Sequence, residues 1–174
     1  MNQPGLPTDG GLHWGNGQRS EGPGAAHDEG MRSLNRHLDT LIRDTWDDLD
    51  RALRITETHP DFSGILPLGD PGLQPFLAKP GVFVILGPQP ALPILHIGAS
   101  RGPIGFVLRS RIEEAPGGGF GWKGEKRSEP RPTFAAIATM EEYWAFAPPL
   151  RNLLAKRLGS EVDSDESKTP TPFV

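Results

Sequence analysis

Two short apolar runs, separated by a loop rich in proline and glycine, constrain the fold of this chain most strongly. Residues 82–86 are VFVIL and residues 94–97 are ILHI, with GPQPALP between them. Apolar runs of this length that are rich in β-branched residues are typical of strands, and a loop of this kind predicts a hairpin. Neither run alternates strictly between apolar and polar residues, so both faces of the hairpin are expected to be covered.

The segment from Asp28 to about Ile55 is the clearest helix. Its apolar residues recur at steps of three and four, which places them on one face, and Asp28 can act as the N-cap. We expect this stripe to pack on the core of its own domain. The alternative is an exposed seam for self-association or for a protein partner. The stripe consists of Met31, Leu34, Leu38, Leu41, Ile42, Trp46, Leu49 and Leu53.

Three further elements follow the hairpin. The pattern predicts a short helix over 104–114, a strand over 133–140 and a final short helix in LRNLLAKRL, which Pro149 can start. The segment APGGGFGWKGEKRSEPRP is expected to be a long polar loop. The fold class is therefore α/β, of the α+β kind: a small three-stranded antiparallel sheet with flanking helices in the order β-β-α-β-α, preceded by the amphipathic helix.

Composition sets the expected domain organisation and environment. We expect a disordered Gly/Pro-rich arm, an amphipathic helix, a connector, one folded domain and a disordered acidic tail. The chain has 174 residues and no cysteine, which excludes disulfides, thiolate metal sites and a cysteine nucleophile. It shows no secretory signal pattern and no apolar run long enough to span a membrane, so a cytoplasmic protein without a membrane partner is expected. The expected segments are 1–26, 27–58, 59–78, 79–158 and 159–174.

Positive charge is concentrated in one part of the chain. The formal net charge is −4, yet residues 99–132 contain 7 Lys or Arg and 4 Asp or Glu, which gives +3. A local basic segment of this kind can face phosphate. A solvated loop with an excess of basic residues would give the same pattern.

Two familiar motifs occur in contexts that do not suit them. Residues 98–102 match the G-x-S-x-G spacing of a hydrolase nucleophile elbow around Ser100, but that fold needs a histidine after the serine, and the last histidine in the chain is His96. Residues 119–124 match G-x-G-x-x-G, but they lie in a predicted loop and run into EKRSEPRP, which cannot start a helix. Neither motif predicts a site.

The hairpin and the elements after it resemble the GIY-YIG nuclease family. GVF at 81–83 and HIG at 96–98 take the places of the two tripeptides that name the family. VLRSRI fits the helix that follows them, and APPLRNLLAKRL resembles the family's last helix. The resemblance covers about residues 79–158. It implies hydrolysis of phosphodiesters in DNA with a single divalent metal, Mg²⁺ or Mn²⁺.

Carried over residue by residue, the resemblance implies a partly replaced catalytic set. Phe83 stands at the first tyrosine and has no hydroxyl, whereas His96 stands at the second and could act as a general base. The helix arginine maps to Arg111, with Arg109 as the competing choice. The glutamate that holds the metal maps to Arg151, and a cation there cannot ligate Mg²⁺. Only a different alignment would assign that role to Glu141 or Glu142.

We therefore expect a divergent GIY-YIG-like domain that binds nucleic acid, with residual metal-dependent hydrolysis of phosphodiesters as one possible activity. If it cleaves, the resemblance assigns catalysis to His96 and Arg111 and phosphate binding to Arg101, Arg109 and Arg151. No metal ligand is assigned, and Mg²⁺ or Mn²⁺ is required only if the domain is active. The alternative hypothesis is a catalytically inactive scaffold that acts as a protein-interaction module.

Overall fold

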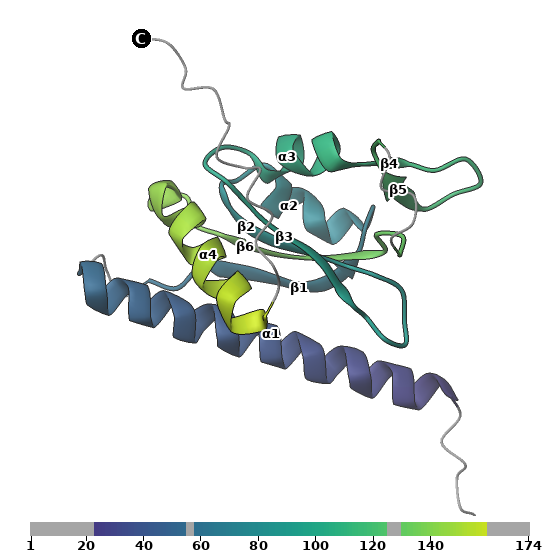
Figure 1. Ribbon diagram of the computed structural model, residues 1–174, viewed down its shortest axis with the longest axis horizontal. Helices are drawn as coiled ribbons and strands as arrows, with labels where there is room; N and C mark the ends of the chain where they lie inside the picture. Colours follow the sequence, from purple (N-terminus) through teal and green to yellow (C-terminus); the bar gives the residue numbers. More distant parts are fainter. Residues whose placement is uncertain (1–22, 55–57, 125–129, 160–174) are drawn as a thin grey trace, which may run out of the picture.

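A computed structural model describes residues 23–54, 58–124 and 130–159. It has three layers, with a four-stranded antiparallel sheet between two sets of helices (Figure 1). The N-terminal arm and the acidic tail that the sequence predicts lie almost entirely outside the described residues. The elements, in order, are α1 (Pro23–Leu53), β1 (Asp61–Pro67), η1 (Pro71–Leu73), α2 (Gln74–Leu77), β2 (Gly81–Leu86), β3 (Ile94–Ser100), α3 (Ile104–Arg111), β4 (Ile112–Glu114), β5 (Phe120–Trp122), β6 (Phe134–Thr139), η2 (Trp144–Phe146) and α4 (Ala147–Leu158).

The mixed α+β class and the hairpin are as expected, but the prediction of three strands was wrong. The sheet order is β1-β6-β2-β3, and β2 pairs with both β3 and β6. The fourth strand, β1, lies within the segment 59–78 that was expected to be a connector and pairs with β6. Its sequence, DFSGILP, contains glycine and ends in proline, which are residues that weaken a strand prediction. At the edge of the sheet both are tolerated.

Side chains supply the hydrogen bonds that an irregularity in β1 would otherwise lose. The register with β6 shifts between Phe62 and Ile65, and Gly64 has a φ of +73° there. Ile137 N–H donates to Ser63 Oγ at 2.9 Å. Ile65 N–H donates to the Asn35 side-chain oxygen at 2.7 Å, which also ties β1 to α1. Because contacts from two other elements fix this strand, its local sequence alone is a poor guide to it.

Two element boundaries also differ from the expectation. Helix α1 begins at Pro23 and not at Asp28, because proline is accepted in the first turn, where its missing N–H has no helical partner. Helix α3 ends at Arg111, and the chain continues directly as β4, which pairs with β5 in a two-stranded sheet. The expected polar loop therefore contains the second strand of a small hairpin.

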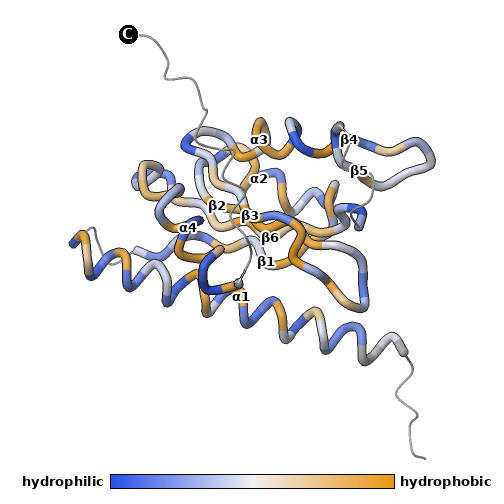
Figure 2. Tube along the Cα trace, viewed as in Figure 1, coloured by the Kyte–Doolittle hydropathy of each residue, from blue (hydrophilic) through white to orange (hydrophobic). Residues whose placement is uncertain are grey.

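One face of the sheet is covered by α1 and α4, which lie next to each other (Figure 1). Hydrophobic and hydrophilic residues alternate along the whole of α1 (Figure 2). The central residues of its apolar stripe are buried: Leu38 and Trp46 are 1% exposed and Ile42 is 3% exposed. These residues pack on the core of their own domain, as expected, and do not form an exposed seam, whereas Leu53 at the end of the stripe is 51% exposed.

The other face of the sheet is covered by α2 and α3. Phe83 and Ile85 of β2 and Ile137 of β6 pack there against Ile104 and Leu108 of α3. Because successive side chains on a strand point to opposite faces, Val82 and Val84 of the same strand pack on the α1 and α4 side. All six residues of β2 are buried, which explains why its sequence does not alternate.

A polar contact fastens α4 to α1 at the surface. Arg157 of α4 donates to the Thr45 hydroxyl at 2.8 Å and also to the Asp48 carboxylate. This hydrogen bond from Arg157 lowers the pKa of Asp48 below its ordinary value of 3.8.

Among the described residues, no helix is both long and apolar enough to cross a membrane.

Candidate functional site

The two glycines that flank the hairpin motifs are required by packing. A Cβ atom at Gly98 would lie 2.2 Å from the Phe83 ring, which sits across the strand pair from it. At Gly81, where φ is +156°, a Cβ atom would lie 2.1 Å from the Ala138 carbonyl oxygen. Real Cβ atoms essentially never approach so closely. The glycines of GVF and HIG therefore have a structural cause that is independent of any chemistry.

The residues at the two tyrosine positions lie against each other inside the fold. Phe83 is fully buried in the core beneath α3. The His96 ring lies 5.8 Å from the Phe83 ring, measured between centroids, at an angle of 47°. His96 is only partly buried, and it points to the side of the sheet that carries α3. The two tyrosine positions thus hold a phenyl ring and an imidazole ring, and Phe83 supplies no hydroxyl.

Arg151 lies on the opposite side of the sheet from His96. It belongs to α4 and is 6% exposed. Its Nε donates to the Ile97 carbonyl oxygen at 3.0 Å, and one terminal nitrogen donates to the Asn152 side-chain oxygen at 3.0 Å. The guanidinium fastens α4 to β3, and the structure does not bring it together with His96.

The other three predicted arginines lie in or next to α3. Arg101 is exposed in the turn that joins β3 to α3, whereas Arg109 and Arg111 lie in the last turn of the helix. Arg109 is exposed and Arg111 is partly exposed. These positions also suit the helix itself, because cations stabilise the C-terminal end of a helix dipole.

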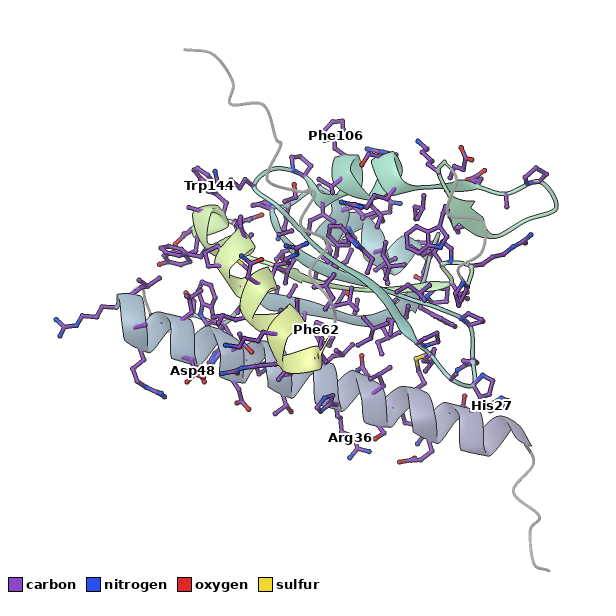
Figure 3. The ribbon with its side chains drawn as sticks, viewed as in Figure 1. His27, Arg36, Asp48, Phe62, Phe106 and Trp144 are labelled. Atoms are coloured by element: carbon purple, nitrogen blue, oxygen red, sulfur yellow. The ribbon has the colours of Figure 1, made fainter. Side chains whose placement is uncertain are left out.

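An exposed aromatic ring accompanies these cations. Phe106 is 69% exposed, and its side chain stands at the outer edge of the molecule (Figure 3). The Arg109 guanidinium carbon lies 5.5 Å from the centroid of that ring, within the range of a cation–π contact. Lys123 of the loop after β5 donates through its ammonium to the Arg109 carbonyl oxygen, and its N–H donates to the Arg111 carbonyl oxygen at 2.8 Å.

We call Phe106, Arg109, Arg111 and Lys123 the α3 surface. It combines an exposed ring, the Arg109 guanidinium beside that ring, the Lys123 ammonium hydrogen-bonded to the Arg109 carbonyl oxygen, and Arg111 in the same last turn of the helix. Glu113 and Glu114 are exposed on β4 directly after the helix, so the positive charge is local. Such a surface can stack an unpaired base on the ring and pair the flanking phosphates with cations.

The residues present do not fit the divalent metal that the resemblance implies. Within residues 23–54, 58–124 and 130–159, no three or more His, Asp and Glu side chains are grouped so that they could hold a metal ion. The position that corresponds to the metal-binding glutamate is taken by the buried cation Arg151. Glu141 forms an ion pair with Lys79 at 3.2 Å, and Glu141 and Glu142 both line a pocket beside Trp46 of α1.

Ser100 also has a structural role. It is 8% exposed, and its hydroxyl accepts a hydrogen bond from the Gly102 N–H at 3.2 Å within the turn that leads to α3.

Comparisons with models of protein families, with curated proteins and with solved structures found no match to this chain. The resemblance to the GIY-YIG nucleases therefore stays a prediction.

Sequence reasoning did not single out Phe106 or Lys123. Phe106 is one of several apolar residues in the predicted helix 104–114. A helical projection separates it from Ile104 and Leu108, which are the buried pair, so a signal was available. Lys123 lies in a segment that was expected to be a loop, and only the pairing of β4 with β5 brings it to the end of α3. No local pattern indicates that contact.

Proposed function

We propose that this chain binds single-stranded nucleic acid through the α3 surface, on a scaffold like that of the GIY-YIG nucleases. The observation that carries the proposal is the exposed Phe106 ring with the Arg109 guanidinium over it. The order β2, β3, α3, β6, α4 along residues 79–158, with the β4–β5 hairpin inserted between α3 and β6, supports the GIY-YIG-like scaffold. A cytoplasmic location is also part of the proposal.

Binding without hydrolysis is the form of the activity that these residues favour. His96 packs against Phe83, and Arg151 is occupied inside the fold. The residues that the resemblance assigns to catalysis and phosphate binding thus come from both sides of the sheet. The cations of the α3 surface do not depend on that arrangement, because two of them lie in the last turn of α3 and Lys123 is hydrogen-bonded to the backbone of that turn.

The alternative, a protein-interaction module that uses residues 28–55, finds less support. The residues of that helix with the largest apolar side chains, Leu38, Ile42 and Trp46, are buried against the sheet and α4. They are unavailable to a partner unless the domain opens.

The test is the affinity for a fluorescent oligo-dT strand, measured by anisotropy with purified protein. Base–aromatic stacking is worth about 1–3 kcal/mol per base, so Phe106→Ala should weaken binding by about 5- to 150-fold. The matched control is Trp144→Ala, because Trp144 is another exposed ring, 47% exposed, that lies outside the α3 surface. Trp144→Ala should leave the affinity unchanged.

A second pair of variants tests the phosphate contacts. Arg109→Ala should weaken binding and lower the slope of log affinity against log salt by about 0.7, the value for one phosphate contact with a single strand. Arg36→Ala, at an exposed position of α1, is the control and should do neither. Equal effects of Phe106→Ala and Trp144→Ala, or a salt slope unaffected by Arg109→Ala, would contradict the proposal.

A further inference from the structure

One serine lies on the outward face of α3, within the α3 surface. Ser110 is exposed and follows Phe106 by four residues. Side chains four residues apart on a helix are neighbours, with Cβ atoms about 5–6 Å apart. The Ser110 hydroxyl therefore lies beside the Phe106 ring, which stands at the outer edge of the molecule (Figure 3). The buried residues of the helix, which include Ile104 and Leu108, lie on its other side.

The Ser110 hydroxyl makes a local hydrogen bond within its own helix. It donates to the Val107 carbonyl oxygen at 2.6 Å, three residues back. Among the residues that the structure describes, no hydrogen bond joins this hydroxyl to another element. Serine is also a weaker helix former than alanine, because its hydroxyl competes for backbone groups. The packing of the fold therefore gives no reason for a hydroxyl at this position.

Cations surround this hydroxyl. Ser110 is the only serine in the chain with an arginine on both sides, Arg109 before it and Arg111 after it. Arg109 and Ser110 follow Phe106 by three and four residues, so both are neighbours of that ring on the helix surface. The Arg109 guanidinium carbon lies 5.5 Å from the ring centroid, and the Lys123 ammonium donates to the Arg109 carbonyl oxygen. An anionic group attached to Ser110 Oγ would stand among these cations.

We propose that Ser110 is a phosphorylation site that switches off binding at the α3 surface, an inference that rests on the proposed function. A protein kinase that selects serines beside arginine transfers the phosphoryl group from ATP. Ser110 Oγ forms a bond to the γ-phosphorus, the bond from that phosphorus to the departing ADP oxygen breaks, and the hydroxyl proton passes to the base of the kinase. Ser110 is next to the last residue of an eight-residue helix, and helix ends open at low cost, which gives the kinase access.

The phosphoserine opposes binding in two ways. It carries a charge of about −1.5 to −2 at pH 7 and three acceptor oxygens. The phosphoryl group pairs with the Arg109 guanidinium and thereby takes the place of a phosphate of the bound strand. Its remaining charge repels the other phosphates of that strand.

The first test compares the full chain with and without phosphoserine installed at position 110 during translation, by anisotropy with fluorescent oligo-dT. Phosphoserine there should weaken binding about 10-fold or more, and phosphatase treatment should restore the affinity. The matched control is phosphoserine at position 33. Ser33 is also exposed and also follows an arginine, but it belongs to α1, on the opposite face of the sheet from α3. At about 0.1 M salt, charges are screened over about 10 Å, so the control should leave the affinity unchanged.

The second test treats the unmodified chain with ATP and a kinase directed at arginine–serine dipeptides, and maps the phosphate by mass spectrometry. We expect phosphate on Ser110, and Ser110→Ala should keep its affinity for oligo-dT after the same treatment. If no phosphate reaches Ser110, or if phosphoserine at positions 110 and 33 has equal effects, the inference is overturned. If the unmodified chain does not bind oligo-dT, the proposed function fails and the inference fails with it. Binding that phosphoserine at position 110 leaves unchanged would overturn the inference alone.

Discussion

Replacing Gly98 by alanine tests whether packing requires the glycine of the HIG motif. The new Cβ atom would lie 2.2 Å from one carbon of the Phe83 ring and 2.7 and 2.8 Å from two others. Phe83 is fully buried, and its ring is surrounded by the core under α3, so it has no free space into which to move. Overpacking a core costs about 1–3 kcal/mol, and three contacts this short place Gly98→Ala at about 3 kcal/mol.

The assay is thermal and urea unfolding of the purified variant. For a domain of this size, a loss of about 3 kcal/mol lowers the Tm by about 10 °C. Gly102→Ala is the matched control, because nothing lies within 4 Å of the Cβ position there. Its free energy of unfolding should stay within about 0.5 kcal/mol of the wild type.

A double variant shows whether the Phe83 ring is the cause. Phe83→Leu removes the ring atoms that Gly98 meets, so Gly98→Ala should cost about 2 kcal/mol less in that background. If Gly98→Ala costs less than about 0.5 kcal/mol in the wild type, or costs the same in both backgrounds, the packing explanation is wrong.

Three further variants test other contacts. Arg151→Lys should lower the free energy of unfolding by about 1–3 kcal/mol, since lysine lacks the Nε–H that donates to the Ile97 carbonyl, and should leave oligonucleotide affinity unchanged. Asp48→Asn should destabilise the protein at pH 7. The pKa of Asp48 is lowered in the folded state by Arg157, so its contribution is present above pH 3.8 and is lost as the pH falls through the lowered pKa. The difference between wild type and variant, followed by urea unfolding from pH 7 downward, should therefore disappear in acid. Leu38→Asp places a charge at a side chain that is 1% exposed and should unfold the domain. Circular dichroism and sedimentation distinguish this from the dissociation of a dimer that keeps its fold.

The sequence was sufficient for the elements with a strong local signal. The hairpin followed from two β-branched runs around a Pro/Gly loop, and α1 followed from its 3.6-residue periodicity. Strand β1 was missed because its pairing with β6, 67 to 78 residues away along the chain, and its contact with Asn35 determine it. A short run with a glycine and a terminal proline carries little local signal for a strand.

In the candidate site, too, the sequence was sufficient only where it carries a local signal. The basic segment and its arginines could be found from charge alone, and three of them do lie in or beside α3. The position of Arg151 could not be predicted from the sequence. Whether an arginine on a short helix faces water or a strand depends on how α4 packs against β3. The pocket beside Trp46 also depends on β1, since Asp61 reaches it only through the strand that the sequence did not predict.

The most direct test of the central claim is one titration of a fluorescent oligo-dT strand with the wild-type protein in Mg²⁺, followed by a denaturing gel of the same samples. The account predicts saturable binding that weakens about 10-fold or more between 50 and 150 mM salt, because three cations of the α3 surface release counterions together with Arg101. It also predicts that the strand stays intact. Absence of binding at low salt, or a shortened strand that EDTA prevents, would contradict it.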